Sequence, residues 1–79
     1  MELQDFIAKF AEQFDETDIS VFKADTEYKY LDEWSSMYAL SVIAMIDAEY
    51  GVTIKGDDIR KSETVDDLFN IVKEYKTQG

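Results

Sequence analysis

The chain has 79 residues, 46% of them hydrophobic, and a formal net charge of −10 from 18 acidic and 8 basic side chains. This length predicts a single domain over residues 1–79, and the hydrophobic content argues against full disorder. The acidity disfavours nucleic-acid binding through a basic patch and favours partners with basic surfaces. The sequence contains neither Cys nor His, which excludes disulfides, thiol nucleophiles, His-based triads and His-ligated metal sites within the chain.

No apolar run approaches the roughly 18 residues needed to span a bilayer, and no basic-then-apolar leader precedes the domain. We therefore expect a cytoplasmic monomer without membrane insertion. The carboxylate pairs Asp57/Asp58 and Asp66/Asp67 fall at predicted helix starts, so capping explains them better than acid–base chemistry. The chain is not expected to be an enzyme by itself, and no metal site is predicted.

The first predicted helix covers residues 2–14. Its apolar residues recur at the spacing of one helix face, and they are Leu3, Phe6, Ile7, Phe10, Ala11 and Phe14. A connection of about twenty residues follows, over 15–34, and loops of this length usually carry function or local structure. We expect it to pack across the bundle through a set of apolar residues, Ile19, Val21, Phe22, Tyr28, Tyr30 and Leu31.

The strongest helical signal lies in residues 31–54, where Ser35 and Ser36 mark the predicted helix start. Residues 37–50 lack Gly and Pro, and Gly51 is the usual residue just past a helix end. One apolar side comprises Met37, Leu40, Ile43 and Ala44. Another comprises Ala39, Val42, Ile43 and Ile46, with Tyr50 one turn beyond. So broad an apolar arc predicts a central helix that is buried on more than one side.

A short third helix is predicted over 57–61 and a fourth over 65–76, which gives an all-α bundle of four helices. Only Ile59 is strongly apolar in the short helix, so little burial energy holds it and it is a candidate flap. Thr64 can cap the fourth helix. The buried stripe of that helix comprises Val65, Leu68, Phe69, Val72 and Tyr75. Residues 77–79 are expected to fray.

The start of the second helix favours an anion, because free backbone N–H groups and the positive end of the helix dipole meet there. A serine at this position is either a plain cap or the attachment point of a phosphodiester. The surrounding residues run Glu33, Trp34, Ser36, Met37 and, at the helix end, Glu49 to Val52. They resemble the acyl carrier protein family, in its variant that reads Glu-Trp-Asp-Ser-Leu.

The resemblance covers nearly the whole chain, most firmly residues 31–75, and it implies the acyl carrier fold: three longer helices, a short third helix and a long first loop. It also implies that the Ser36 hydroxyl receives 4′-phosphopantetheine from coenzyme A, with Ser35 as the alternative. The thiol of that arm would hold acyl groups as thioesters in fatty-acid synthesis or in a specialised lipid, polyketide or surface-glycan route. Implied partners are a phosphopantetheinyl transferase and acyl-transferring or acyl-processing enzymes with basic and apolar docking patches.

Two sets of residues acquire roles through the resemblance. The implied acyl pocket has walls at Leu40, Ile43, Ile46, Ile54, Ile59 and Leu68, each of which is equally explained as ordinary core. The implied partner surface comprises Trp34, Met37, Tyr38, Ser41 and Asp47. Trp34 is also expected to be a partly exposed lid or anchor beside the arm, and Tyr28 lies near the family's aromatic loop anchor.

The chain departs from the family pattern at several positions. Ser35 replaces the acid that usually precedes the modified serine, and it can keep the cap hydrogen bond but not the charge. Tyr38, Ser41 and Ala48 stand where acids are common, so we expect specialised partners and charge steering from Asp32 and Glu33. These departures leave open an unmodified, carrier-shaped interaction adaptor. An acidic nucleic-acid mimic has only the net charge in its favour.

Overall fold

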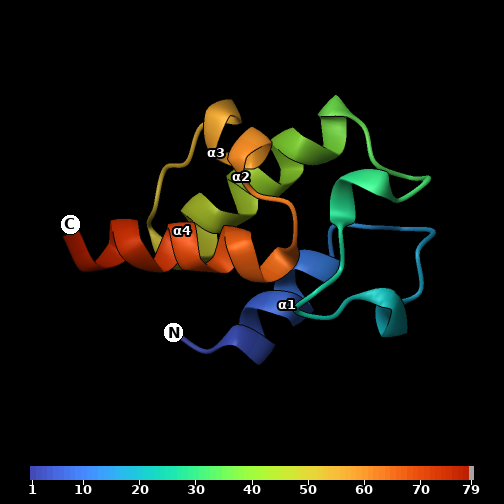
Figure 1. Ribbon diagram of the computed structural model, residues 1–79, viewed down its shortest axis with the longest axis horizontal. Coiled ribbons are helices and arrows are strands. Elements are labelled where there is room, and N and C mark those ends of the chain that lie inside the picture. The colour runs from blue at the N-terminus through green and yellow to red at the C-terminus, as the bar shows by residue number, and fades with distance from the viewer. Residues whose placement is uncertain (79) are drawn as a thin grey trace.

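The computed structural model describes residues 1–78, which form four α-helices: α1 (Leu3–Ala11), α2 (Ser36–Tyr50), α3 (Gly56–Lys61) and α4 (Val65–Gln78). Two 3₁₀ turns, η1 (Ile19–Val21) and η2 (Tyr28–Tyr30), interrupt the connection between α1 and α2. α1 contacts both α2 and α4, α3 contacts α4, and the long connection folds over one end of the bundle (Figure 1). The predicted all-α bundle is confirmed. No helix within residues 1–78 is at once long and apolar enough to cross a bilayer.

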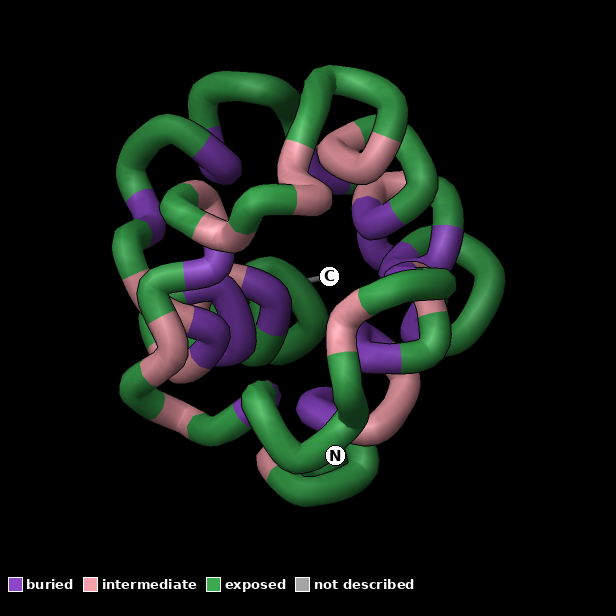
Figure 2. The backbone as a smooth tube through the Cα atoms, turned by 90° about the vertical axis from the view of Figure 1, so that its right-hand side faces the viewer, coloured by how far each residue is buried: buried purple, intermediate pink, exposed green. Residues whose placement is uncertain are grey.

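Apolar side chains from all four helices and from the long connection meet in one core. Figure 2 shows the buried segments turned towards the inside of the molecule, with exposed backbone around them. Burial of apolar surface, at about 25 cal/mol per Å², is the main force that holds so small a bundle together. The largest fully buried apolar side chains are Tyr28, Phe6, Phe10, Ile46, Ile54 and Leu68.

Helix α1 ends at Ala11, earlier than the predicted boundary at residue 14. Beyond it, the N–H groups of Gln13 and Phe14 donate to the carbonyls of Phe10 and Ala11, each over 3.1 Å. These bonds span three residues instead of four, so the chain tightens into a 3₁₀-like turn. The turn leaves Phe14 buried and stacked on the ring of Tyr38, with the ring centroids 5.0 Å apart.

The long connection is only partly held by apolar side chains. Phe22 and Tyr28 are buried as predicted, but Ile19, Val21 and Tyr30 are exposed, and their predicted packing is wrong. Backbone hydrogen bonds take over part of that role, because the N–H groups of residues 65 and 66 donate to carbonyls of residues 26 and 24. The connection is therefore tied to the start of α4.

Helix α2 begins and ends where the sequence predicts. Gly51 follows it with φ 67°, a left-handed conformation that costs glycine little. The prediction of burial on more than one side is wrong, because Met37, Leu40 and Ala44 are exposed. Only the opposite face lies in the core, through Val42, Met45, Ile46 and Tyr50.

Helices α3 and α4 fit their predicted positions closely. α3 begins one residue early, at Gly56; α4 continues through Gln78, so residues 77 and 78 remain helical and Gly79 lies outside the described residues. Tyr75 is 39% exposed instead of buried, since its hydroxyl donates to Asp58 Oδ1 over 2.9 Å. Asp58 also accepts the Lys55 N–H, so one carboxylate both caps the start of α3 and joins it to Tyr75 of α4. The candidate flap thus has more anchors than its single apolar residue suggests.

Candidate functional site

Ser36 occupies the first position of α2, and its side chain is exposed. The helix that follows has 15 residues and is fixed to the core through its far face. The first turn of α2 contains no acidic residue of its own, and the carboxylate bonded to that turn is Glu33, which precedes the helix. This corner presents a hydroxyl to solvent at a helix end that favours an anion.

Ser35 precedes the helix in an extended conformation, with φ −156° and ψ 175°. Its carbonyl accepts the first helical bond, from the Ala39 N–H over 3.1 Å. Its side chain, however, makes no capping hydrogen bond, so the prediction that Ser35 keeps that bond is wrong. The start of α2 therefore lacks the local cap that usually defines a helix end.

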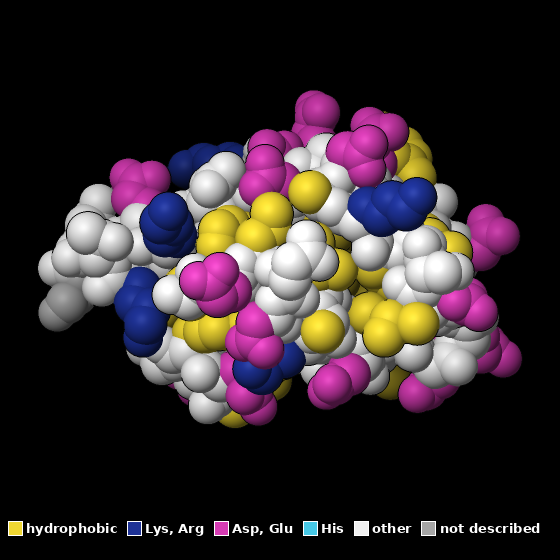
Figure 3. Space-filling model, turned by 90° about the horizontal axis from the view of Figure 1, so that it is seen from below, with side chains coloured by type: hydrophobic (Ala, Val, Ile, Leu, Met, Phe, Trp, Pro, Cys, Tyr) yellow, Lys and Arg dark blue, Asp and Glu magenta, His cyan; other side chains and the backbone are white. Residues whose placement is uncertain are grey.

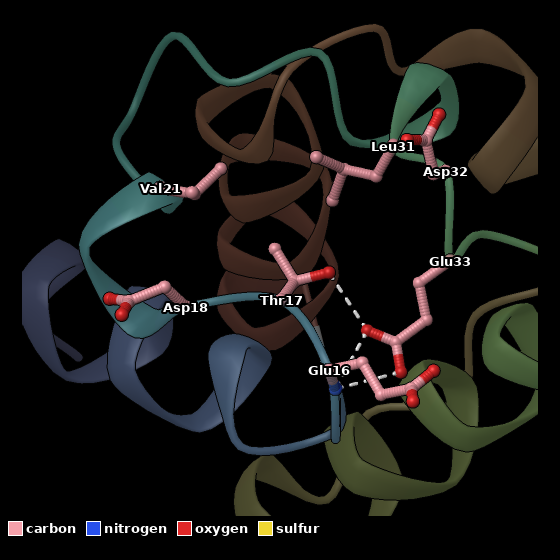
Figure 4. Close-up of a pocket in the computed structure, with 7 residues that line it drawn as sticks. All are labelled: Glu16, Thr17, Asp18, Val21, Leu31, Asp32 and Glu33. Atoms are coloured by element: carbon pink, nitrogen blue, oxygen red, sulfur yellow. Dashed lines mark hydrogen bonds between the residues drawn. The ribbon is translucent and has the colours of Figure 1, made fainter.

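Glu33 supplies the polar contacts that the serines do not. One carboxylate oxygen, Oε2, accepts the N–H groups of Asp15 and Glu16 over 3.1 and 3.0 Å and the Tyr38 hydroxyl over 2.6 Å. The other, Oε1, accepts the Thr17 hydroxyl over 2.8 Å. Figure 4 shows Glu33 reaching across to residues 16 and 17 at the edge of a hollow. We call this group of contacts the Glu33 clamp.

The hydrogen bonds of the clamp shift the pKa values of both Glu33 and Tyr38. The hydrogen bond from Tyr38 is the main cause that lowers the pKa of Glu33, and bonds from Thr17 and two backbone N–H groups add to it. The same bond, together with desolvation, raises the pKa of Tyr38 to about 12. Glu33 is therefore ionised and Tyr38 neutral at pH 7, which is the pairing that the bond requires.

Aromatic side chains pack around the clamp and hold its residues in place. The ring of Phe14 stacks on Tyr38 at an interplanar angle of 7° and on Trp34 at 24°. Trp34 also meets the buried ring of Tyr28 edge-on, with centroids 5.0 Å apart. Residues on both sides of the two serines are thus fixed to the end of α1 and to the long connection.

The structure separates the residues of the predicted partner surface into two groups. Met37 is 76% exposed, and Ser41 and Asp47 are exposed on α2. Trp34 and Tyr38 are half-buried and engaged with Phe14, so their rings serve the fold first. Leu40, 66% exposed, lies on the same helix as Met37 and joins it in an apolar strip that also includes Ala44.

The predicted walls of an acyl pocket do not enclose an open chamber. Ile46, Ile54, Ile59 and Leu68 are buried in the common core, Ile43 is half-buried, and Leu40 faces solvent and is no wall. Four hollows on the surface of residues 1–78 are all lined by other residues. The five inner positions act as core in this structure, as their apolar character alone would predict.

One hollow lies beside the start of α2. It has a volume of about 200 Å³ and mixed polar and apolar walls, formed by Gln13, Asp15, Met37, Tyr38 and Ser41. A larger one, of about 440 Å³, opens between the two 3₁₀ turns and is the hollow drawn in Figure 4. Within residues 1–78, no group of three or more acidic side chains is placed to hold a metal ion.

Comparisons of the chain with family models, with curated proteins and with solved structures found no match. The site must therefore be interpreted from its own residues. Sequence reasoning placed Ser36 at the start of α2 but missed the Glu33 clamp, three of whose four donors lie 16 to 18 residues earlier in the chain. The only sequence feature that hints at the clamp is the position of Glu33 and Trp34 directly before the two serines.

Proposed function

We propose that this chain is an acyl carrier protein in which Ser36 Oγ bears 4′-phosphopantetheine as a phosphodiester. The observation that carries the proposal is the exposed Ser36 side chain at the first position of α2, with no acid in the first helical turn. A phosphate there would meet the positive end of a helix held rigidly by the core. The order of three longer helices and a short third one agrees with the carrier type that the sequence resembles.

The residues around Ser36 are compatible with such an arm. The hollow of about 200 Å³ beside the helix start is lined by the polar residues Gln13, Asp15, Tyr38 and Ser41 next to the apolar Met37. This mixture suits a chain of amides and methylene groups better than a purely apolar acyl tail. When bound, the arm supplies a terminal thiol that carries acyl groups as thioesters.

The partners we propose are a phosphopantetheinyl transferase and enzymes that transfer or process acyl groups. The exposed strip Met37, Leu40 and Ala44 on α2 would meet an apolar docking patch. The net charge of −10 favours a basic rim around that patch. A flexible arm on a small rigid body keeps its cargo at high effective concentration near each enzyme, which is the physical advantage of a carrier.

The test is to incubate the chain with coenzyme A, magnesium and a broad-specificity transferase, and then to measure its intact mass. We expect one phosphopantetheine per chain, its complete loss in Ser36→Ala and its retention in Ser35→Ala. Loss in Ser35→Ala alone would move the site by one residue. No adduct with any transferase, including the host's own, would contradict the carrier function.

The second candidate is an interaction adaptor that shares the fold but is never modified. The exposed strip favours it, since Met37 and Leu40 leave most of their apolar surface in water without any need for a cofactor. Ser35 in place of an acid would also weaken recognition by a transferase. The intact-mass experiment separates the two candidates, because an adaptor keeps its unmodified mass under every loading condition.

A further inference from the structure

The start of α2 is held by side chains that are distant in sequence, and Glu33 is their meeting point. Its carboxylate accepts two backbone N–H groups and one hydroxyl from residues 15–17, the segment that leaves α1. It also accepts the hydroxyl of Tyr38, which lies in the first turn of α2. A single carboxylate therefore joins the end of α1 to the helix that carries Ser36.

Apart from the stacking of Phe14 on Tyr38 and Trp34, few other contacts fix this corner. Ser35 makes no side-chain cap, and the first turn of α2 contains no acid to complement the helix dipole. Ser35, Ser36 and Met37 are all exposed and contribute little packing. The position of the Ser36 hydroxyl thus depends on its neighbours, Glu33 and Trp34 before it and Tyr38 after it.

We infer that Glu33 is a positioning residue, whose carboxylate clamp holds the first turn of α2 in the conformation in which a loading enzyme meets Ser36. This inference rests on the proposed carrier function. Ionised carboxylates form stronger hydrogen bonds than neutral acceptors, and four donors converge on this one. Without it, the donors turn to water and the first turn of α2 frays.

The expected signature in loading kinetics is a change in KM without a change in kcat. If fraying leaves the first turn formed only part of the time, the apparent affinity of the transferase falls by that fraction. Once docked, the segment is ordered again, so the chemical step is unaffected. We expect KM for Glu33→Ala to rise about fivefold while kcat stays within about twofold of the wild type.

Three further variants define the role of the carboxylate. Glu33→Gln keeps one acceptor oxygen but loses the charge, so its KM should lie between that of the wild type and that of Glu33→Ala. Tyr38→Phe keeps the ring on Phe14 and removes one of the four donors, and should raise KM about twofold. Glu12→Gln removes the same charge at the exposed end of α1 outside the clamp, and should leave KM unchanged.

Amide hydrogen exchange measures the clamp without any loading enzyme. In Glu33→Ala, the amides of Asp15 and Glu16 lose their acceptor and should exchange at least about tenfold faster. The Ala39 amide, which makes the first helical bond of α2, should follow them. Amides in the middle of α4 should keep their wild-type rates, which shows that the variant is folded.

The outcomes are distinct. Faster exchange at residues 15, 16 and 39 together with a raised KM supports the inference. Unchanged exchange, or faster exchange with an unchanged KM, overturns it. If no transferase loads the wild type, the proposed function fails. In that case exchange of the Ala39 amide in Glu33→Ala is the remaining test. Faster exchange than in the wild type supports the inference that Glu33 stabilises the first turn of α2, and an unchanged rate refutes it.

Discussion

At the scale of single residues, carboxylates that accept backbone N–H groups define where segments start. Asp67 Oδ2 accepts the N–H groups of Glu63 and Thr64 over 3.0 and 3.2 Å, and Thr64 Oγ1 accepts the Asp67 N–H over 3.1 Å. The two side chains thus cap α4 reciprocally. The backbone bonds also lower the pKa of Asp67, so the carboxylate stays ionised when it caps.

The first prediction concerns this cap. Thr64→Ala removes the acceptor for the Asp67 N–H and should lower the free energy of unfolding by about 1 kcal/mol in urea titrations. Thr53→Ala is the matched control, since Thr53 is exposed and lies in the connection between α2 and α3, outside any helix. It should change stability by less than about 0.5 kcal/mol. Equal effects of the two variants would contradict the capping role.

The second prediction uses the pH dependence of the Glu33 clamp. The pKa of Glu33 is lowered in the folded chain, so its contribution to stability is present above the usual glutamate value of about 4.3 and is lost as pH falls through the folded pKa. The stability gap between wild type and Glu33→Gln should therefore be constant from pH 7 to about 5 and shrink by pH 3. Urea titrations at each pH measure the gap. A gap that is independent of pH would refute a charged clamp.

Short-range sequence signals predicted the structural roles of some residues but not of others. Gly51 after α2 and the Thr64/Asp67 pair at α4 are recognisable because their partners lie within four residues. Three of the four donors to Glu33 lie 16 to 18 residues earlier, and only the folded chain brings them near, so local patterns do not reveal the whole clamp. Ser35 shows the reverse error, since a good capping residue type makes no cap here.

At the scale of elements, α2 has one face in the core and an apolar strip in water. The third prediction tests this division. Ile46→Ala leaves a cavity at a fully buried position and should cost about 2–5 kcal/mol of stability. Leu40→Ala removes an exposed side chain of similar size and should change stability by less than about 0.5 kcal/mol. Thermal or urea unfolding gives both values, and a large loss in Leu40→Ala would show that the strip is covered.

The outward direction of this strip was not predictable from α2 alone. Apolar residues occur nearly all round the helix, so periodicity does not single out one face. The packing decides the outcome: α1 contacts α2, while Met37, Leu40 and Ala44 of α2 remain exposed. In α1 and α4 charged residues mark the wet side, and there the predicted buried faces are largely correct.

At the scale of the whole molecule, electrostatic repulsion opposes folding. Figure 3 shows acidic side chains distributed over one face with apolar side chains between them, in agreement with a net charge of −10. The ion pairs within residues 1–78 join Lys9 to Asp5 and Glu49, and Arg60 to Asp57; Lys9 is partly exposed and the other partners are exposed. Exposed pairs contribute little, so salt has more repulsion than attraction to screen.

The fourth prediction follows from that balance. Raising the NaCl concentration from about 0.01 to about 0.15 M shortens the screening length from about 30 to about 8 Å. The Tm should rise, and a relief of about 1 kcal/mol corresponds to about 4–8 °C for a chain of this size. Calorimetry at constant pH measures the shift. A Tm that is constant or falls with salt would contradict net self-repulsion.

The order and spacing of the four helices could be predicted from the sequence, because α1 and α4 have clear apolar periods and residues such as Gly51 and Thr64 mark helix ends. The paths of residues 15–34 could not, since Ile19 and Tyr30 look like core residues but polar contacts decide their place. The acyl chamber was a prediction from family resemblance, and in this structure its inner positions are packed core. The carrier proposal therefore depends on the helix start and not on a preformed pocket.

The most direct measurement locates the modification on the chain isolated from its own cells. Cleavage after Lys29 and Lys55 releases one peptide, residues 30–55, that contains Ser35, Ser36 and Ser41. Fragmentation of this peptide in a mass spectrometer assigns any added group to one hydroxyl. The carrier proposal predicts 4′-phosphopantetheine on Ser36. A peptide that is always unmodified, or an arm on Ser41 in the second turn of α2, would contradict it.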